Sequence, residues 1–143
     1  MIHDITTDME DPPQFGILSS MRTADENSLE YAGEEVASLQ RDFYPEVKAL
    51  QTRLTQQTAF QNAAETARKL GWEMVVEDES SGIIEAYETS KIFGFVDDVV
   101  IRVKSTPEGS RVDLRSVSRV GMSDLGMNAA RINKFCEMFL SKS

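Results

Sequence analysis

The stretch FGFVDDVVIRV at residues 93–103, followed by SRVDLRSVSRVGMSDLGMNAAR at residues 110–131, decides the fold of this chain. In both parts, apolar residues alternate with charged or small polar residues, and this period of two is typical of strands with two different faces. The loop between them contains Pro107 and Gly109, as expected of a hairpin connection. The stretch therefore predicts two neighbouring antiparallel strands, at residues 95–104 and 111–120, followed by a helix. It indicates an architecture but no reaction.

The alternation also assigns the side chains of these two strands to opposite faces. The apolar face consists of Phe95, Val99, Ile101, Val103, Val112 and Leu114. The other face is rich in charge and carries Asp98, Arg102, Lys104, Arg111, Asp113, Arg115 and Arg119. An antiparallel register that keeps the apolar sets together places Arg102 opposite Asp113 and Asp98 near Arg115, because a slip of one residue would mix the faces.

Residues before this stretch predict two helices and two further strands. Apolar spacings of three and four predict a short helix at residues 29–42 and a stronger helix at 56–70. The stronger helix begins at Thr55 or Thr58 and ends at Gly71, a C-cap glycine. Alternating residues predict strands at 72–77 and 83–89. After the last strand, Ser123 is expected to be the N-cap of a final helix, with Asp124 in its first turn.

The predicted fold class is α+β. The four strands form a four-stranded antiparallel meander flanked by helices packed on one face. Residues 1–28 are polar and interrupted by Asp11-Pro12-Pro13, so they are expected to form an irregular, extended N-terminal arm. Residues 29–143 then form a single α+β domain in the order helix, four strands, helix, and 143 residues suit one domain.

The composition excludes several classes of function. A net charge of −9 repels phosphate backbones, so we expect no nucleic-acid partner. The single cysteine, Cys136, is expected to be a small buried hydrophobic side chain, and it permits no internal disulfide or cysteine cluster. The single histidine, His3, lies beside Asp4 and Asp8, but such pairs in polar arms are usually only solvated. We therefore predict no metal site, no cofactor and no catalytic residue.

The sequence contains no apolar run of the roughly 20 residues that a membrane span needs. The first residues, MIHDITTDMEDPPQF, lack the features of a signal peptide. We expect a chain that is soluble as written. Its compartment is then cytoplasmic, or membrane-peripheral or periplasmic if a targeting segment is missing, and any membrane contact is indirect or made through such a segment.

The charged strand face has two interpretations. It is either a solvated face stabilised by cross-strand charge pairs, each contributing about 0.2–1 kcal/mol, or a recognition surface for a carboxylate, a phosphate or an acidic partner. The candidate binding residues are Asp98, Arg102, Asp113, Arg115, Arg119 and, from the last helix, Arg131. Asp97 interrupts the apolar alternation, so we expect a bulge there or hydrogen bonds from the preceding turn. Trp72, Phe93 and Phe95 are expected to be core aromatic residues.

The motifs also resemble one known family. They are Gly71-Trp72, the strand sequence at residues 95–103, the strand sequence at 111–121, Ser123-Asp124-Leu125-Gly126-Met127-Asn128, the opening at residues 3–8 with Asp11-Pro12-Pro13, and Tyr44-Pro45. Together they are similar to the bacterial and plastid family called domain of unknown function 1499, over nearly the whole chain. The resemblance implies no activity, substrate or catalytic residue. It implies a place at a membrane or outside the cytoplasm, because members often follow hydrophobic segments or export signals.

Three functions are consistent with these observations. The first is a non-catalytic interaction module that binds a protein partner or a small anionic ligand through the charged sheet face. The second is a carrier of an apolar ligand, lipid-like or isoprenoid, in a cavity between sheet and helices. The third is an enzyme that uses Asp97 or Asp98 with an arginine, which would need a carboxylate with a raised pKa in a pocket.

Overall fold

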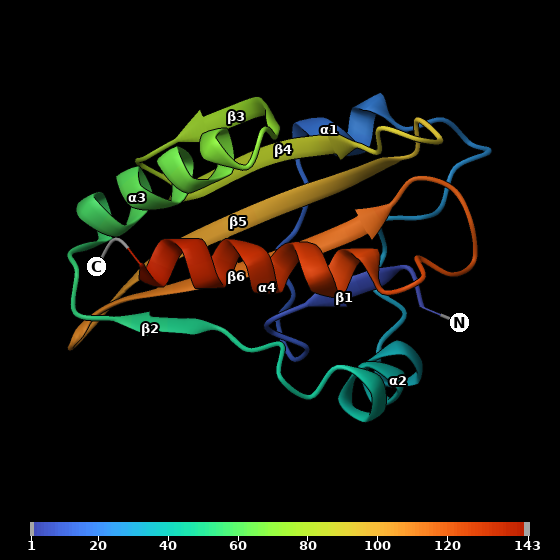
Figure 1. The fold of residues 1–143 in the computed structure, drawn as a ribbon. Helices are drawn as coiled ribbons and strands as arrows, with labels where there is room; N and C mark the ends of the chain where they lie inside the picture. Colours follow the sequence, from blue (N-terminus) through green and yellow to red (C-terminus); the bar gives the residue numbers. More distant parts are fainter. Residues whose placement is uncertain (1, 142–143) are drawn as a thin grey trace.

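One antiparallel sheet of six strands forms the centre of this protein, and the computed structural model describes residues 2–141 of the chain (Figure 1). The strands are β1 (Asp4–Thr6), β2 (Leu50–Thr52), β3 (Glu73–Asp78), β4 (Ile83–Thr89), β5 (Val96–Thr106) and β6 (Gly109–Ser118). Their order is β1-β6-β5-β4-β3, and β2 also pairs with β6. The α+β class and the meander from β3 to β6 are confirmed. The predicted number of strands is two too low, because β1 and β2 have three residues each and leave no period-two pattern.

The long hairpin of β5 and β6 has the register that the alternation predicts. Arg102 lies opposite Asp113, as expected. Asp98 lies opposite Val117 and Arg115 lies opposite Val100, so Asp98 and Arg115 are diagonal neighbours. Of the two alternatives for Asp97, the bulge is wrong, because Asp97 pairs with Ser118 in the regular ladder; its carboxylate lies 2.9 Å from Arg131.

Two helices, α3 (Gln56–Lys69) and α4 (Met127–Leu140), cover one face of the sheet, as predicted; Figure 1 shows them in front of the strands. The side chain of Thr55 accepts a hydrogen bond from the backbone N–H of Thr58 and caps α3. After α3, Gly71 has a φ of 84°, the left-handed conformation that a C-cap glycine adopts. The N-cap at Thr55 and the C-cap glycine at Gly71, both predicted from the sequence, are therefore confirmed.

The hydrophobic core lies between these helices and the sheet. Trp72 stacks on Phe135 with ring centroids 5.6 Å apart, and Phe135 stacks on Phe139 at 6.0 Å. Truncating a buried aromatic side chain of this kind to alanine typically costs about 3–5 kcal/mol. Cys136 is partly buried against the same core, and burial raises the pKa of its thiol to about 11.

The opposite face of the sheet is covered by the N-terminal arm, which continues from β1 through α1 (Ile17–Met21). In Figure 1, α1 lies behind β4, and its Leu18 is fully buried. The prediction of a solvated charged face is wrong: Asp98, Asp113 and Arg115 are each at most 2% exposed. An alternating pattern separates the two faces of a strand, but it does not distinguish a solvated charge from a buried charge with a partner.

The helix α2 (Glu34–Phe43) lies beside the outer edge of β1 (Figure 1). The buried side chain of Gln40 accepts a hydrogen bond from the N–H of Thr6 at 3.1 Å and donates to the Thr6 carbonyl at 2.7 Å. This amide therefore takes the place of a neighbouring strand. The helix begins five residues later than residue 29, the predicted start, because Gly33 at φ 77° forms its N-cap.

The start of α4 also differs from the prediction. The helix begins at Met127, and its N-cap is Gly126 with a φ of 84°. Ser123 is therefore not the N-cap, because the chain makes an extra turn in which Leu125 adopts a φ of 54°. Asp124 instead accepts a hydrogen bond from the N–H of Gly126 at 2.7 Å within this turn.

None of the helices within residues 2–141 combines the length and the apolar composition that a membrane crossing requires.

Candidate functional site

Arg115 connects the middle of β6 to both ends of the arm. Its guanidinium makes a bidentate ion pair with Asp4 of β1, at 3.0 and 2.8 Å, and donates to the carbonyls of Pro13 and Leu29. The rings of Phe15 and Tyr31 lie 5.4 and 5.6 Å from the guanidinium carbon, within the range of a cation–π contact. Arg115 is therefore a structural centre of the arm rather than a free binding group.

Asp98 on β5 is held by two arginines. Arg119 binds both of its carboxylate oxygens, with the shortest distance 2.8 Å, and Arg22 of the arm binds one of them at 2.9 Å. Arg22 also donates to the carbonyls of Asn27 and Val117. The carboxylate of Asp98 is 0% exposed, so its charge is compensated entirely inside the protein. Asp98 and Arg115 are near each other, as expected, but they pair with other residues, Asp98 with Arg119 and Arg22, and Arg115 with Asp4.

A third cluster joins the start of the arm to the far end of the hairpin. Arg102 donates to Asp8 at 3.1 Å and lies 3.6 Å from Asp113, which also binds Arg111 at 2.7 Å. Burial alone would raise the pKa of Asp8, but hydrogen bonds from the backbone N–H groups of Asp11 and Glu10 and the two arginine charges outweigh it and lower this pKa. Asp8 therefore stays ionised and holds the arm.

Glu85 is a member of the buried charged face that sequence reasoning missed. Its carboxylate is 2% exposed and accepts hydrogen bonds from the backbone N–H groups of Gly16, Ile17 and Leu18, at 3.0–3.1 Å. A negative charge at the first turn of α1 satisfies donors that have no partner within the helix. The alternation of β4 carried a signal, because Glu85 stands between the apolar residues Ile84 and Ala86.

The six predicted site residues thus do not form one site. Asp98, Arg102, Asp113, Arg115 and Arg119 lie on the face that the arm covers, where they pair with residues of the arm or of the neighbouring strands. Arg131 does not join them, because α4 packs on the opposite face of the sheet.

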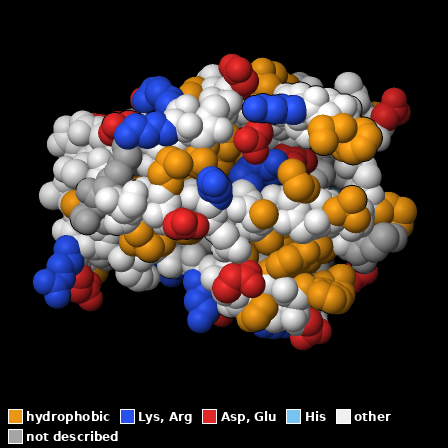
Figure 2. Space-filling view, in the orientation of Figure 1, with side chains coloured by type: hydrophobic (Ala, Val, Ile, Leu, Met, Phe, Trp, Pro, Cys, Tyr) orange, Lys and Arg blue, Asp and Glu red, His pale blue; other side chains and the backbone are white. Residues whose placement is uncertain are grey.

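Arg131 belongs to a second polar cluster, which we call the polar recess. It consists of Glu88, Asp97, Ser116, Ser118, Asn128 and Arg131. Register explains the cluster: Glu88 of β4 lies opposite Asp97 of β5, and Asp97 lies opposite Ser118 of β6. These side chains form a row across three strands at the end of the sheet. Figure 2 shows blue and red side chains together above α4, between the helix and the strands.

Arg131 is the central group of the polar recess. Its Nε donates to Glu88 at 2.6 Å, and its Nη1 donates to Asn128 at 3.0 Å and lies 2.9 Å from Asp97. Its Nη2 makes no hydrogen bond to any residue that the structure describes. The Glu88 side chain is 34% exposed, whereas those of Arg131 and Asp97 are 5% and 11% exposed, so solvent reaches the cluster chiefly at Glu88. The polar recess therefore offers a partner mainly the carboxylate of Glu88.

Exposed apolar side chains lie close in sequence to three members of the polar recess. Phe95 and Val120 lie just outside the ends of β5 and β6, two residues from Asp97 and Ser118, and Met127 precedes Arg131 by one helical turn. Each of these three side chains is about half exposed. Further out are Ile92 and Phe93 on the β4–β5 loop and Met122 and Leu125 on the β6–α4 loop.

We call these seven side chains the apolar rim. The two loops that carry them are neighbours, since the N–H of Arg119 donates to the Val96 carbonyl at 3.0 Å. Figure 2 shows apolar side chains at this end of the molecule, on the right. Phe93 and Phe95 stack on each other at 5.6 Å, and they are 73% and 53% exposed. The prediction that these two are core aromatics is wrong, whereas Trp72 does lie in the core.

The described residues contain no group of three or more His, Cys, Asp or Glu side chains with the geometry to hold a metal ion. The chemistry that remains in the polar recess is hydrogen bonding and ion pairing by a guanidinium, two carboxylates, two hydroxyls and an amide. These groups recognise polar atoms, and the apolar rim recognises apolar surface.

The family described as "Protein of unknown function (DUF1499)" matches residues 4–139. This chain belongs to that family, and the resemblance inferred from its motifs is confirmed. No curated protein matches the chain. Because the family description assigns no activity, any function has to be argued from the site itself.

Proposed function

We propose that this member of the DUF1499 family is a non-catalytic interaction module that binds a protein partner through the apolar rim and the polar recess. One observation carries the proposal. Eleven large apolar side chains among the described residues are strongly exposed, and seven of them form the apolar rim at one end of the molecule. A monomeric protein rarely exposes such a concentration of apolar surface unless something binds it.

The polar recess favours a protein over a lipid bilayer as the partner. A bilayer would cover the partly exposed carboxylate of Glu88 with hydrocarbon, and burying a charge without hydrogen bonds to replace water is costly. A protein can place a donor at Glu88 while its apolar side chains cover the apolar rim. Aromatic residues, methionine and arginine are the residue types enriched at the centre of such interfaces. The net charge of −9 also disfavours anionic membranes.

This proposal places the binding surface at the end of the sheet instead of on the charged face expected from the sequence. Binding through the charged face would require the arm to leave. Its departure would break the contacts of Asp98 with Arg22 and of Arg115 with Asp4, and it would expose the fully buried side chain of Leu18.

The two other functions, a carrier of an apolar ligand and an enzyme that uses an aspartate with an arginine, remain predictions. A hollow of about 430 Å³ between α3 and β3 lies at the surface, and its lining includes charged side chains, which suits an apolar ligand poorly. An enzyme that uses Asp97 would have to release this carboxylate from Arg131, 2.9 Å away. No specific observation favours either function over the interaction module.

A pair of matched variants tests the proposal. One variant, F93S/F95S/M122S, removes three side chains of the apolar rim, and the control, I17S/M21S/F43S, removes three exposed apolar side chains elsewhere. Each protein is returned to its native source, cross-linked and isolated. We expect a stoichiometric partner that the control retains and the rim variant loses.

Two outcomes would sink the proposal. The first is a partner that both variants retain. The second is binding of phosphatidylcholine vesicles that the rim variant abolishes while no protein partner is found, because it would identify the apolar rim as a membrane surface.

A further inference from the structure

The two edges of the sheet differ in whether their outward-facing backbone groups have partners. At the β1 edge, the side chain of Gln40 occupies the backbone groups of Thr6, so this edge is closed. At the other edge, β3 pairs only with β4, and no other strand of the described residues lies beside it. An open strand edge presents unpaired N–H and C=O groups that a further strand is able to bind.

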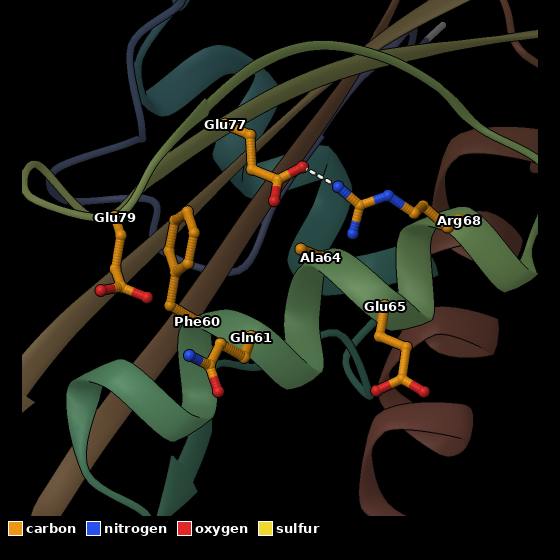
Figure 3. Close-up of a pocket in the computed structure, with 7 residues that line it drawn as sticks. All are labelled: Phe60, Gln61, Ala64, Glu65, Arg68, Glu77 and Glu79. Atoms are coloured by element: carbon orange, nitrogen blue, oxygen red, sulfur yellow. Dashed lines mark hydrogen bonds and ion pairs between the residues drawn. The ribbon is translucent and has the colours of Figure 1, made fainter.

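A groove runs beside this open edge, between β3 and α3. Its volume is about 430 Å³, and Phe60 and Ala64 of α3 line it. Figure 3 shows Glu77 of β3 directed toward Arg68 of α3 across the groove, and Glu79 on the same side as Glu77. The groove therefore offers two apolar side chains among mostly polar and charged ones, next to a strand edge.

The charges along this edge have a single sign. Residues 70–82 contain four carboxylates and no lysine or arginine: Glu73, Glu77, Asp78 and Glu79. Glu77 is already paired with Arg68, but the other three have no cationic partner among the described residues. Glu73 lies opposite Tyr87 and Glu77 lies opposite Ile84, so the register shift between Met74 and Val76 places these two glutamates on opposite faces.

We propose that the open edge of β3 binds an extended peptide segment rich in lysine or arginine, which adds to the sheet as a seventh strand. Strand addition supplies main-chain hydrogen bonds, and pockets for alternate side chains supply specificity. One face of the added segment contacts the groove, where its cations reach Glu79 and Glu77. The other face brings a cation near Glu73.

The same charges disfavour other occupants. A second copy of the chain pairing through β3 would set carboxylates against carboxylates, and like charges on neighbouring strands are destabilising. This surface is distinct from the apolar rim, because Glu77 and Glu79 lie toward the end of the sheet opposite to Glu88. The two proposals therefore succeed or fail separately.

Synthetic peptides test this inference on the full chain. The probe, called the Lys-Val peptide, is an acetylated, amidated peptide of two Lys-Lys-Val-Val repeats, which carries lysine on both faces of a strand. One comparison peptide has two Glu-Glu-Val-Val repeats, and the other is the Lys-Val peptide with every residue N-methylated, which removes all its main-chain donors. We expect binding of the Lys-Val peptide alone, with slowed amide hydrogen exchange in residues 73–78. Equal binding of the N-methylated peptide, or no binding of the probe, would overturn strand addition.

Reversing the charge of two residues distinguishes binding at the β3 edge from nonspecific attraction of the peptide to the net negative charge. The variant E73K/E79K changes two exposed carboxylates near the β3 edge, Glu79 beside the groove and Glu73 on the other face of the strand, and the control E35K/E108K makes the same change of net charge at exposed positions elsewhere. We expect the Kd of the Lys-Val peptide to rise at least tenfold in E73K/E79K and less than threefold in the control. Equal weakening in both variants would show that the peptide binds only the net negative charge.

Discussion

Arg115 illustrates at the residue scale how a charged side chain on a strand serves the interior. Replacing it by methionine leaves Asp4 buried without its cation and removes two hydrogen bonds to carbonyls. We expect R115M to lower the free energy of unfolding by about 3–5 kcal/mol, measured by urea denaturation. Lysine should not restore it, because an ammonium cannot make the bidentate pair.

A matched double variant shows whether the lost stability belongs to the ion pair. D4N/R115M removes the uncompensated charge, so it should be more stable than R115M alone. Additive losses from the two substitutions would contradict the coupling between Asp4 and Arg115.

At Tyr31, in contrast to Arg115, we expect a substitution that does not lower the stability of the protein. Its hydroxyl is buried and has no hydrogen-bond partner among the described residues, while its ring lies over Arg115. An unsatisfied buried polar group typically costs about 1–3 kcal/mol. Y31F keeps the ring and removes the hydroxyl, so we expect thermal unfolding at neutral pH to show equal or greater stability. A clear loss of stability would show that the hydroxyl does have a partner.

The same residue predicts a pH dependence. Burial, followed by the charge of Asp4, raises the pKa of Tyr31 to about 12 from an ordinary value of 10.0. The folded state therefore holds this proton more tightly than the unfolded state, and stability falls as the pH rises from 10 toward 12. We expect Y31F to show a smaller loss over this range in urea denaturation. Identical slopes for the two proteins would contradict the shift.

The face that each residue occupies was predictable at this scale, but its partners were not. The alternation placed Asp98, Asp113 and Arg115 on one face correctly. The partners of Asp98 and Arg115 include Arg22 and Asp4, which lie in an arm without periodicity. No local pattern encodes contacts across 76 and 111 residues of sequence, so these ion pairs required the tertiary structure.

At the scale of elements, the turn before α4 stores backbone strain. Leu125 adopts a φ of 54°, in the left-handed region that asparagine tolerates better than leucine, and its side chain is 91% exposed. We expect L125N to raise the free energy of unfolding by about 0.5–1 kcal/mol, because it relieves this strain without removing buried contacts. The control G126A, at φ 84°, should lower it by about 1 kcal/mol. Equal stability of L125N and the native protein would contradict the assignment.

The arm is the element whose position depends most on ion pairs. Arg22 connects Asp98 to the carbonyls of Asn27 and Val117, so R22M should loosen the arm from the sheet. We expect faster amide hydrogen exchange in residues 7–31 and unchanged exchange in α4, measured by mass spectrometry. Unchanged exchange in the arm would mean that apolar contacts such as those of Leu18 hold it without Arg22.

Long, strongly patterned elements were predictable, and short or glycine-capped ones were less so. The β4 strand and helix α3 were predicted almost to their observed bounds, because their patterns run over several residues. The strands β1 and β2 are held by pairing with β6 rather than by their own pattern. At α4, Ser123 was a good cap by composition, but the left-handed Gly126 starts the helix.

At the scale of the whole molecule, the two faces and two edges of the sheet have different roles. Helices cover one face, the arm seals the other, and Gln40 closes one edge. What remains accessible is the apolar rim with the polar recess, together with the open edge of β3. The apolar rim was not predictable from sequence, because Phe93 and Phe95 are residue types that usually lie in a core. The polar recess was not predictable either, since it joins residues of β4, β5, β6 and α4.

The central claim is that a protein partner binds the end of the molecule that carries the apolar rim. Photo-crosslinking tests it most directly, with benzoylphenylalanine placed at Met122 and, as the control, at Phe43, which is exposed to a similar degree away from the apolar rim. After irradiation in the native source, we predict a discrete protein adduct from position 122 that is absent from position 43. The same adduct from both positions, or only lipid adducts from position 122, would contradict the account.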